Sequence, residues 1–207
     1  MFGFTGIFGI IAGYVGAVIL IISLFVYLFA IKKGKVTSNR VTWGVWILVN
    51  ALFCASYYES VGLVSSIWVP LVYLISTIII FLFLLAYGAS GEWTWVEKVC
   101  LVGVGVILML WIIFRAPLTT LTLTMMIDIL GAIPLIVAVW KNPEIDYGPA
   151  WYFGFGANAI NLLAIEHWDY ANASYPLYLT ILTLTVSVLI RFPRFLRTQK
   201  TSVFVKT

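Results

Sequence analysis

Long apolar runs are the feature that most limits what this chain can fold into. About seven of them, each of roughly 20 residues, alternate with short clusters of charged residues, glycine or proline, and this is the length that a helix needs to cross a bilayer. Of the 207 residues, 63% are hydrophobic and 10% are charged, whereas soluble domains carry about 25% charged residues. We therefore predict an all-α, polytopic membrane protein whose first span is retained. The predicted transmembrane helices cover residues 6–31, 42–58, 68–87, 96–114, 118–140, 150–165 and 175–190.

The lysines and arginines are distributed unevenly between the two sides of these spans. The first, third and fifth connections and the C-terminal tail, with Lys98 at the start of the fourth span, hold 11 of the 12, and the opposite side holds only Arg115. The positive-inside rule then places the N-terminus outside and the C-terminus in the cytoplasm. We interpret the net charge of +4 as a topology signal rather than a nucleic-acid-binding surface. The basic tail from Arg191 onward is expected to be loosely ordered.

A Trp-x6-Asn pattern occurs twice. In the second span, Trp43, Trp46 and Asn50 stand at positions i, i+3 and i+7, so a helix presents all three on one face. The pattern returns 108 residues later as Trp151 and Asn158. Further identities at that offset include Lys33 and Lys141, Ala51 and Ala159, and Ile21 and Ile129.

The repeat predicts two parallel three-helix bundles joined by a linker helix. The expected divisions are residues 1–88 for the first bundle, 89–116 for an interfacial segment and the linker, 117–192 for the second bundle, and 193–207 for a basic cytoplasmic tail. This three-plus-one-plus-three plan resembles the SWEET and PQ-loop transporters and, in its Trp-rich second helix, the vitamin transporters of the PnuC type. The Pro-Gln dipeptide of the PQ-loop family is absent; its nearest counterpart is Asp128-x2-Gly131-x2-Pro134. The resemblance implies a transporter whose two bundles rock around a central site.

Glycine and proline predict two local features of the spans. The first span carries Gly9, Gly13 and Gly16 at helical spacing, and small residues in such a pattern let a neighbouring helix approach closely. Pro70 and Pro176 are each expected in the first helical turn of the third span of a bundle, where a missing N–H costs nothing.

Three asparagines, Asn50, Asn158 and Asn161, lie within or near the predicted hydrocarbon layer. An unpaired amide is costly there, so each must find a partner or face water. One interpretation is a hydrogen bond between helices. The other is a pair of repeat-related amides, Asn50 and Asn158, that flank a central cavity and bind a polar solute, with Asn161 as a further candidate.

The tryptophans of the repeat have two interpretations as well. Trp43, Trp46 and Trp151 could give flat apolar walls to a sugar, a nucleobase or another ring. Tryptophan near a helix end is also a common membrane-interface anchor, which suits Trp43 and Trp151. Trp46 lies one turn deeper and is the better pocket candidate.

Asp128 is the only acidic residue in the middle of a predicted span. A carboxylate there costs about 2.5–3.5 kcal/mol to insert, so we expect it to face water, a substrate or a hydrogen-bonding cluster, and to be a candidate for proton coupling. Pro134 has no N–H, so the Leu130 carbonyl one turn earlier loses its helical hydrogen bond and the helix bends there. Together with Gly131, it is either a hinge or a static kink.

The remaining polar residues give no sign of enzyme chemistry. Glu166, His167 and Asp169 follow the sixth span, but nearly consecutive residues at a helix end do not converge on one metal ion. We predict no enzyme activity, no metal and no cofactor.

The leading hypothesis is a facilitator or proton-coupled carrier of a polar, ring-containing solute such as a sugar, nucleoside or vitamin. The rival is a non-transporting seven-helix protein: a receptor, an accessory subunit or a binder of a lipid-soluble ligand. Assembly into a homo-oligomer is left open.

Overall fold

The computed structural model describes residues 6–36, 40–87, 95–114 and 116–204. Every regular element in this part of the chain is a helix. The α-helices are α1 (Ile7–Lys32), α2 (Arg40–Val61), α3 (Trp68–Tyr87), α4 (Trp95–Ile113), α5 (Pro117–Lys141), α6 (Gly148–Asn161) and α7 (Tyr170–Phe204). Short 3-10 turns are η1 (Ser65–Ile67), η2 (Pro143–Ile145) and η3 (Leu162–Ala164). Most of the predicted interfacial segment, residues 88–94, lies outside the described residues.

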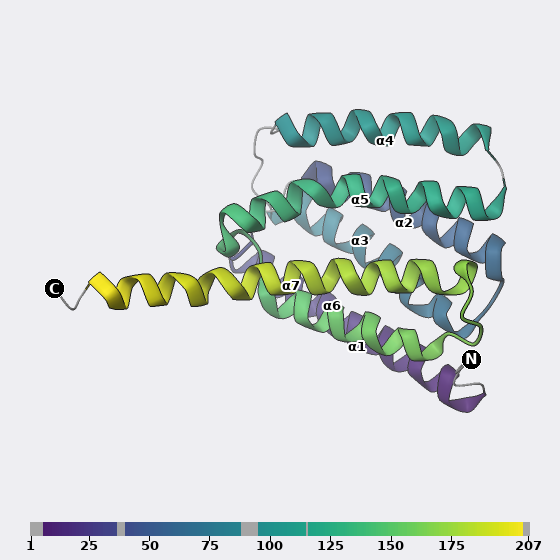
Figure 1. Ribbon diagram of the computed structural model, residues 1–207, viewed down its shortest axis with the longest axis horizontal. Helices are drawn as coiled ribbons and strands as arrows, with labels where there is room; N and C mark the ends of the chain where they lie inside the picture. The colour runs from purple at the N-terminus through teal and green to yellow at the C-terminus, as the bar shows by residue number, and fades with distance from the viewer. Residues whose placement is uncertain (1–5, 37–39, 88–94, 115, 205–207) are drawn as a thin grey trace.

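The helices form one bundle in which α4 lies outermost, against α5 (Figure 1). The helix α3 packs against both α1 and α2, and α7 packs against both α5 and α6. Between these two groups, α1 packs along α6 and α2 packs along α5. Smaller contacts join α2 to α7 and α3 to α6. The two largest apolar clusters among the described residues lie around Tyr27 and Trp43 and around Phe53, Tyr57 and Tyr175.

Within the described residues, four helices are long and apolar enough to cross a membrane, as expected of an integral membrane protein: α1, α3 together with η1, α5, and α7 as far as Arg191. Apolar side chains also cover outward faces of the bundle; Phe25, Val102 and Met109 are each more than 60% exposed. Exposed apolar surface on this scale is typical of a face that contacts a membrane or another protein.

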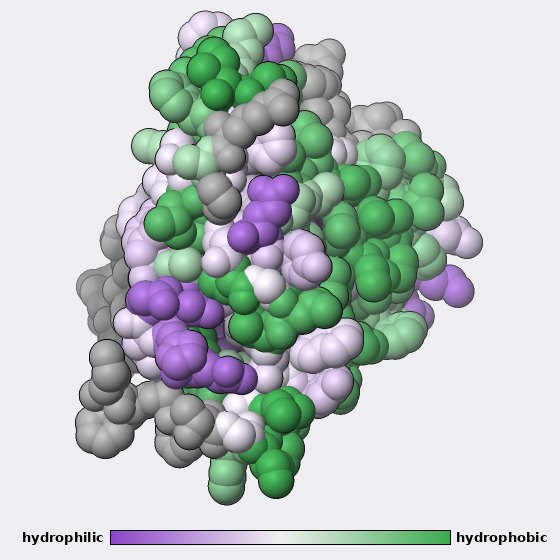
Figure 2. All heavy atoms as spheres, turned by 90° about the vertical axis from the view of Figure 1, so that its right-hand side faces the viewer, coloured by the Kyte–Doolittle hydropathy of each residue, from purple (hydrophilic) through white to green (hydrophobic). Residues whose placement is uncertain are grey.

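The two ends of the bundle differ. The connection from α1 to α2, the connection from α5 to α6 and the C-terminal part of α7 lie at one end (Figure 1), here called the basic end because it carries Lys32, Lys33, Lys35 and Lys141. Hydrophilic side chains gather at the opposite end, seen end-on in Figure 2.

Glycines end the first two helices. Gly34 has φ of +66°, and its N–H donates to the Ile31 carbonyl while the N–H of Lys35 donates to the Ala30 carbonyl. This pair of bonds is the Schellman motif, which satisfies the last carbonyls of a helix. Gly62, with φ of +75°, follows the end of α2.

The glycines of α1 allow the close packing that the sequence predicted. A Cβ atom at Gly13 would collide with the carbonyl oxygen of Ser65 in η1, and one at Gly16 would lie 3.0 Å from the carbonyl oxygen of Ala157 in α6. Gly9 is buried on the same helix. The backbones approach closely because no side chain stands between them.

Three predicted boundaries were wrong. The sixth span was expected to be helical to residue 165, but α6 ends at Asn161 and continues as the 3-10 turn η3. The seventh helix begins at Tyr170 instead of Tyr175, because Asp169 accepts a hydrogen bond from the N–H of Asn172 and so caps the first turn. Pro176 therefore lies in the second turn rather than the first. The tail was expected to be loosely ordered, yet α7 continues to Phe204.

Candidate functional site

A cavity lies inside the bundle, between α1, α3 and α6, with one wall residue each from α2 and α7. The centre of a water molecule can move through about 70 Å³ of it, and one water needs roughly 10–15 Å³ by this measure. The cavity therefore has room for several waters or a small solute. Its walls combine aromatic rings, aliphatic side chains and hydroxyl groups: Leu20, Ser23, Leu24, Tyr27, Trp43, Tyr73, Ser76, Thr77, Ile80, Ala150, Trp151, Gly154 and Thr183.

Two hydroxyl groups of the wall come from matching amide–threonine pairs. The side-chain NH₂ of Asn50 donates to the Trp46 carbonyl at 2.8 Å and to the Thr77 hydroxyl at 3.2 Å. The NH₂ of Asn158 donates to the Gly154 carbonyl at 3.0 Å and to the Thr183 hydroxyl at 3.3 Å. Each amide thus reaches the carbonyl four residues earlier and a threonine on the adjacent helix. Both threonines line the cavity, whereas neither asparagine does.

Asn158 makes one contact that Asn50 lacks. Its NH₂ also donates to the Tyr73 hydroxyl at 2.7 Å, so this amide connects α6 with both α3 and α7. Asn158 is only 1% exposed, and its side-chain oxygen has no hydrogen-bond partner among the described residues. The asparagine therefore sits behind the wall and fixes the position of two hydroxyls that face the cavity.

The cavity keeps hydroxyl groups with unused hydrogen-bonding capacity. Ser76 is 5% exposed, and its hydroxyl has no partner in the part of the chain that the structure describes. The Tyr73 hydroxyl accepts from Asn158, which leaves its own hydrogen available to donate. Buried polar groups in proteins are normally paired, so these two hydroxyls are candidates to bind a polar solute or ordered water.

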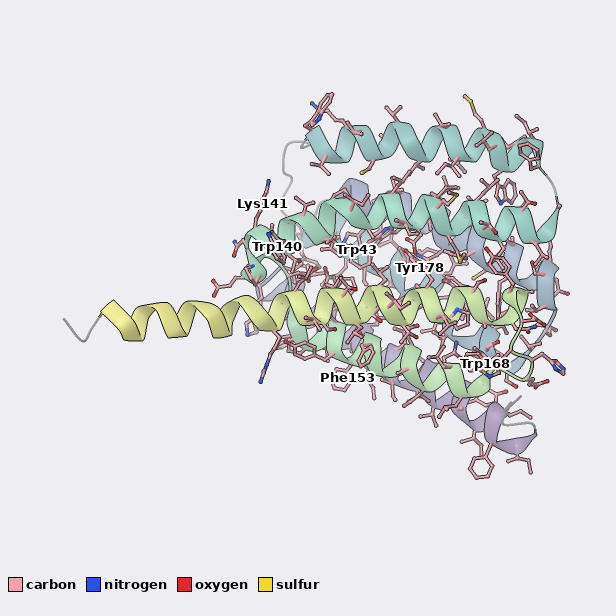
Figure 3. All side chains as sticks on the ribbon, in the orientation of Figure 1. Trp43, Trp140, Lys141, Phe153, Trp168 and Tyr178 are labelled. Atoms are coloured by element: carbon pink, nitrogen blue, oxygen red, sulfur yellow. The ribbon has the colours of Figure 1, made fainter. Side chains whose placement is uncertain are left out.

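The three predicted tryptophans occupy two different positions. Trp43 and Trp151 line the cavity. Trp46 does not; it lies edge-on to Trp43 with ring centroids 5.1 Å apart, and its indole nitrogen is 3.1 Å from the place where a Cβ of Gly131 would stand. Figure 3 shows Trp43 inside the bundle, whereas Phe153 of α6 points away from it.

Asp128 lies on α5, away from the cavity lining. It is 7% exposed and adjacent to Tyr178 of α7, which Figure 3 shows inside the bundle between α5 and α7. Gly131, one turn further, faces Trp46. The helix continues through Pro134, and its ribbon bends as it approaches the basic end (Figure 1). Asp128 thus lies beside α7 and Gly131 beside α2, and neither residue lines the cavity.

Asn161 lies near the end opposite the basic end, and it donates to a carbonyl that a proline leaves without its helical partner. Pro70 has no N–H to give the Ser66 carbonyl four residues earlier, and the NH₂ of Asn161 donates to that carbonyl at 3.3 Å. Pro176 likewise leaves the Asn172 carbonyl free, and the Tyr57 hydroxyl donates to it at 3.1 Å. In both cases the donor comes from the second helix of the other group of three.

Sequence reasoning missed Asp146, which lies between η2 and α6. It is 5% exposed, accepts a hydrogen bond from the backbone N–H of Tyr147 at 2.6 Å, and accepts another from the Tyr27 hydroxyl at 3.4 Å. Burial raises the pKa of Asp146 to about 6, although both hydrogen bonds act in the opposite direction. The prolines at 143 and 149 mark this segment as a connection, and nothing in its sequence separates a buried carboxyl from a solvated one.

The acidic and histidine residues after α6 lie on the surface. His167 and Asp169 are exposed, and Asn172 donates from its backbone N–H and its side chain to Asp169, which lowers the pKa of that carboxyl. Within the described ranges, no group of three metal-ligating side chains comes together.

Comparison with protein-family models, with curated proteins and with solved structures finds no match to this chain.

Proposed function

We propose that the protein is a small membrane transporter that carries a small polar solute by rocking two groups of three helices around the cavity. The observation that carries this proposal is the cavity itself. It lies where α1 and α3 meet α6, its wall includes the hydroxyls of Tyr73 and Ser76, and no charged side chain occurs among its lining residues. An uncharged solute with hydrogen-bond acceptors and a flat face fits such a wall.

The pattern of helix packing supports an internal repeat. Suppose that α1, α2 and α3 correspond to α5, α6 and α7. Each contact within the first group then has its counterpart in the second. Between the groups, the contact of α1 with α6 corresponds to that of α5 with α2, and the contact of α3 with α6 to that of α7 with α2. The amide–threonine pairs correspond too. Two parallel repeats joined by α4 are the plan of several transporters, and we propose kinship with the SWEET and PQ-loop group on this ground. Seven spans then include α2, α4 and α6.

The basic end faces the cytoplasm in this proposal, in agreement with the positive-inside rule. The chain would lie in the bilayer with its N-terminus outside. The bound solute would leave the cavity toward Tyr27, Trp43 and Trp151, which lie near the basic ends of their helices.

Two glycines of α6 give a direct test. Gly154 lines the cavity, and a Cβ there would make only ordinary contacts, 3.7 Å from the Tyr73 hydroxyl and 3.9 Å from Thr183. We expect Gly154→Leu to fill the cavity and to abolish both uptake into proteoliposomes and ligand-induced thermal stabilisation. Stabilisation by ligand at one hundred times its Kd is about 2.7 kcal/mol, which a screen of sugars, nucleosides, vitamins and amino acids detects.

Gly156→Leu is the matched control, because no atom lies within 4 Å of a Cβ at Gly156. Its uptake is expected to equal that of the parent. Equal uptake by both leucine variants would remove the cavity from the transport path. Because part of the wall is apolar, the same variants also test the rival function, a non-transporting binder. That function would be favoured if a lipid-soluble molecule co-purified with the parent but not with Gly154→Leu, and if no polar solute were taken up.

Asp128 is the proposed coupling residue. Its place on α5 beside Tyr178, within the spanning part of the chain, gives a proton a site that is separate from the solute cavity. We expect Asp128→Asn to lose accumulation driven by a pH gradient while it still exchanges solute between the two sides. Accumulation equal to that of the parent would show that Asp128 has a structural role only.

A further inference from the structure

The cavity is bounded at the basic end by rings from both groups of helices. Tyr27 stands near the end of α1, Trp43 near the start of α2 and Trp151 near the start of α6. The rings of Tyr27 and Trp43 are in contact, with centroids 5.3 Å apart. We call these three side chains the floor. For the cavity to open toward the basic end, Tyr27 of the first group must separate from Trp151 of the second.

Polar contacts hold α1 to the second group at this level. The Ser23 hydroxyl donates to the Ala150 carbonyl at 2.7 Å, and the Tyr27 hydroxyl donates to the Asp146 carboxyl at 3.4 Å. The first involves an uncharged acceptor. The second involves the Asp146 carboxyl, whose charge changes with pH. Asp146 lies outside the spanning helices, in the connection between α5 and α6.

An apolar cluster lies next to Asp146 in the chain. In it, Val139 of α5 and Val186 and Ile190 of α7 pack with Trp151 and with Ile145, the residue before Asp146. The titratable groups in contact with it are Tyr27 and Tyr147, and the Lys35 ammonium lies over the Tyr147 ring at 5.4 Å. Other charged residues near this end are exposed: Lys32, Lys33, Lys141, Glu144 and Arg191. Burial raises the pKa of Asp146, and its hydrogen bonds lower it in part.

We propose that Asp146 is a positioning residue that latches the floor: in its neutral form it stays buried under Tyr27 and keeps the basic end closed, and in its ionised form it favours the open arrangement, in which water reaches it. This inference rests on the proposed function for the movement between the two groups of helices. A protonated carboxyl keeps the contact, because its O–H donates to the Tyr27 oxygen.

The direction of the pH effect follows from linkage. With the floor closed, the pKa of Asp146 is about 6; with the floor open, a solvated carboxyl has its ordinary value of 3.8. The closed form therefore binds the proton more tightly, so acid favours closure and rising pH favours opening. These two values give an open-to-closed ratio that rises about tenfold between pH 5 and pH 8 and levels off above pH 7.

The test measures how easily a thiol in the cavity is labelled. Cys54 and Cys100 are replaced by alanine and Ser76 by cysteine, and a polar maleimide is applied to the purified full chain in detergent. The rate at each pH is divided by that of a Lys141→Cys reference, an exposed position at the same end, which removes the pH dependence of the thiol itself. We expect the ratio to rise about tenfold from pH 5 to pH 8.

Variants at Asp146 separate a latch from a merely structural role. Asp146→Asn is permanently neutral and is expected to be labelled slowly at every pH, whereas Asp146→Glu is expected to retain the rise. Glu144→Gln, an exposed acid of the same connection, is expected to match the parent. A flat profile in the parent, or the same profile in Asp146→Asn, overturns the latch. Labelling does not depend on uptake, so the two proposals can fail separately. A pH-dependent labelling profile without any transported solute would support the latch and reject the transporter. Solute uptake with a flat labelling profile would support the transporter and reject the latch.

Discussion

Replacing Gly13 with alanine is expected to destabilise the protein more than any other single methyl group added to α1. The new Cβ would collide with the backbone carbonyl of Ser65 and would stand 3.6 Å from Ala164. A backbone carbonyl in η1 cannot swing aside as the end of a flexible side chain can. Overpacking of this kind costs typically 1–3 kcal/mol, and we expect a loss at the upper end of that range. For a chain of this length it corresponds to a fall of about 10 °C in Tm.

Gly156→Ala on α6 is the comparison, since its Cβ meets open space. Alanine favours a helix over glycine by about 0.8–1.0 kcal/mol, so this variant is expected to unfold at the same temperature as the parent or slightly above it. Thermal unfolding of both variants in one detergent gives the answer. Equal Tm values for Gly13→Ala and Gly156→Ala would contradict the close approach of α1 to η1.

The glycines of α1 also show what could be predicted from the sequence. Their spacing alone predicts a close neighbour, and η1 and α6 are that neighbour. The spacing does not say which helix packs there, because the partner of Gly16 is the Ala157 carbonyl, 141 residues along the chain. A main-chain group is present at every residue, so no pattern of residue types identifies it.

The errors at α6 and α7 have local causes. Leu162, Leu163 and Ala164 are as apolar as the helix before them, so hydropathy gives no sign that α6 tightens into a 3-10 turn. The sequence does carry a signal for the start of α7 in Asp169, a good N-cap residue, whereas Pro176 favours a start at residue 175. A proline in the second turn is tolerated here because Tyr57 satisfies the carbonyl that it leaves free.

The candidate site was predictable in kind but not in arrangement. The 108-residue offset brings out Trp43, Trp151, Asn50 and Asn158. The residues that complete the cavity, Tyr73, Ser76, Thr77 and Thr183, are hydroxyl side chains on α3 and α7, and such residues are common in apolar helices without any role. Only the distances from Tyr73, Thr77 and Thr183 to the two amides distinguish these three.

Those distances lead to the second large effect, at Asn158. Asn158→Ala removes three hydrogen bonds, to Gly154, Tyr73 and Thr183. Such bonds average about 0.6 kcal/mol each in membrane proteins, so we expect a loss of about 2 kcal/mol in the free energy of unfolding. Because the Tyr73 and Thr183 hydroxyls line the cavity, we also expect the affinity for solute to fall by at least about tenfold, which corresponds to 1.4 kcal/mol.

Two other asparagines make this expectation specific. Asn50→Ala removes two bonds, to Trp46 and Thr77, from a half-buried side chain, so both its effects should be smaller than those of Asn158→Ala. Asn161→Ala frees the Ser66 carbonyl, away from the cavity lining, so it should lower stability and leave solute affinity unchanged.

Tyr73→Phe separates positioning from direct binding at Asn158. It keeps the amide and its bonds to Gly154 and Thr183 but removes the hydroxyl that faces the cavity. If Asn158 acts by holding Tyr73, Tyr73→Phe should reproduce a large part of the affinity loss with less loss of stability, and the two substitutions together should cost little more affinity than Asn158→Ala alone. Affinity losses that add would instead mean that the amide itself touches the solute. Measuring both variants and the double variant by thermal shift and proteoliposome uptake therefore decides whether the repeated asparagines bind the solute or shape the wall that does.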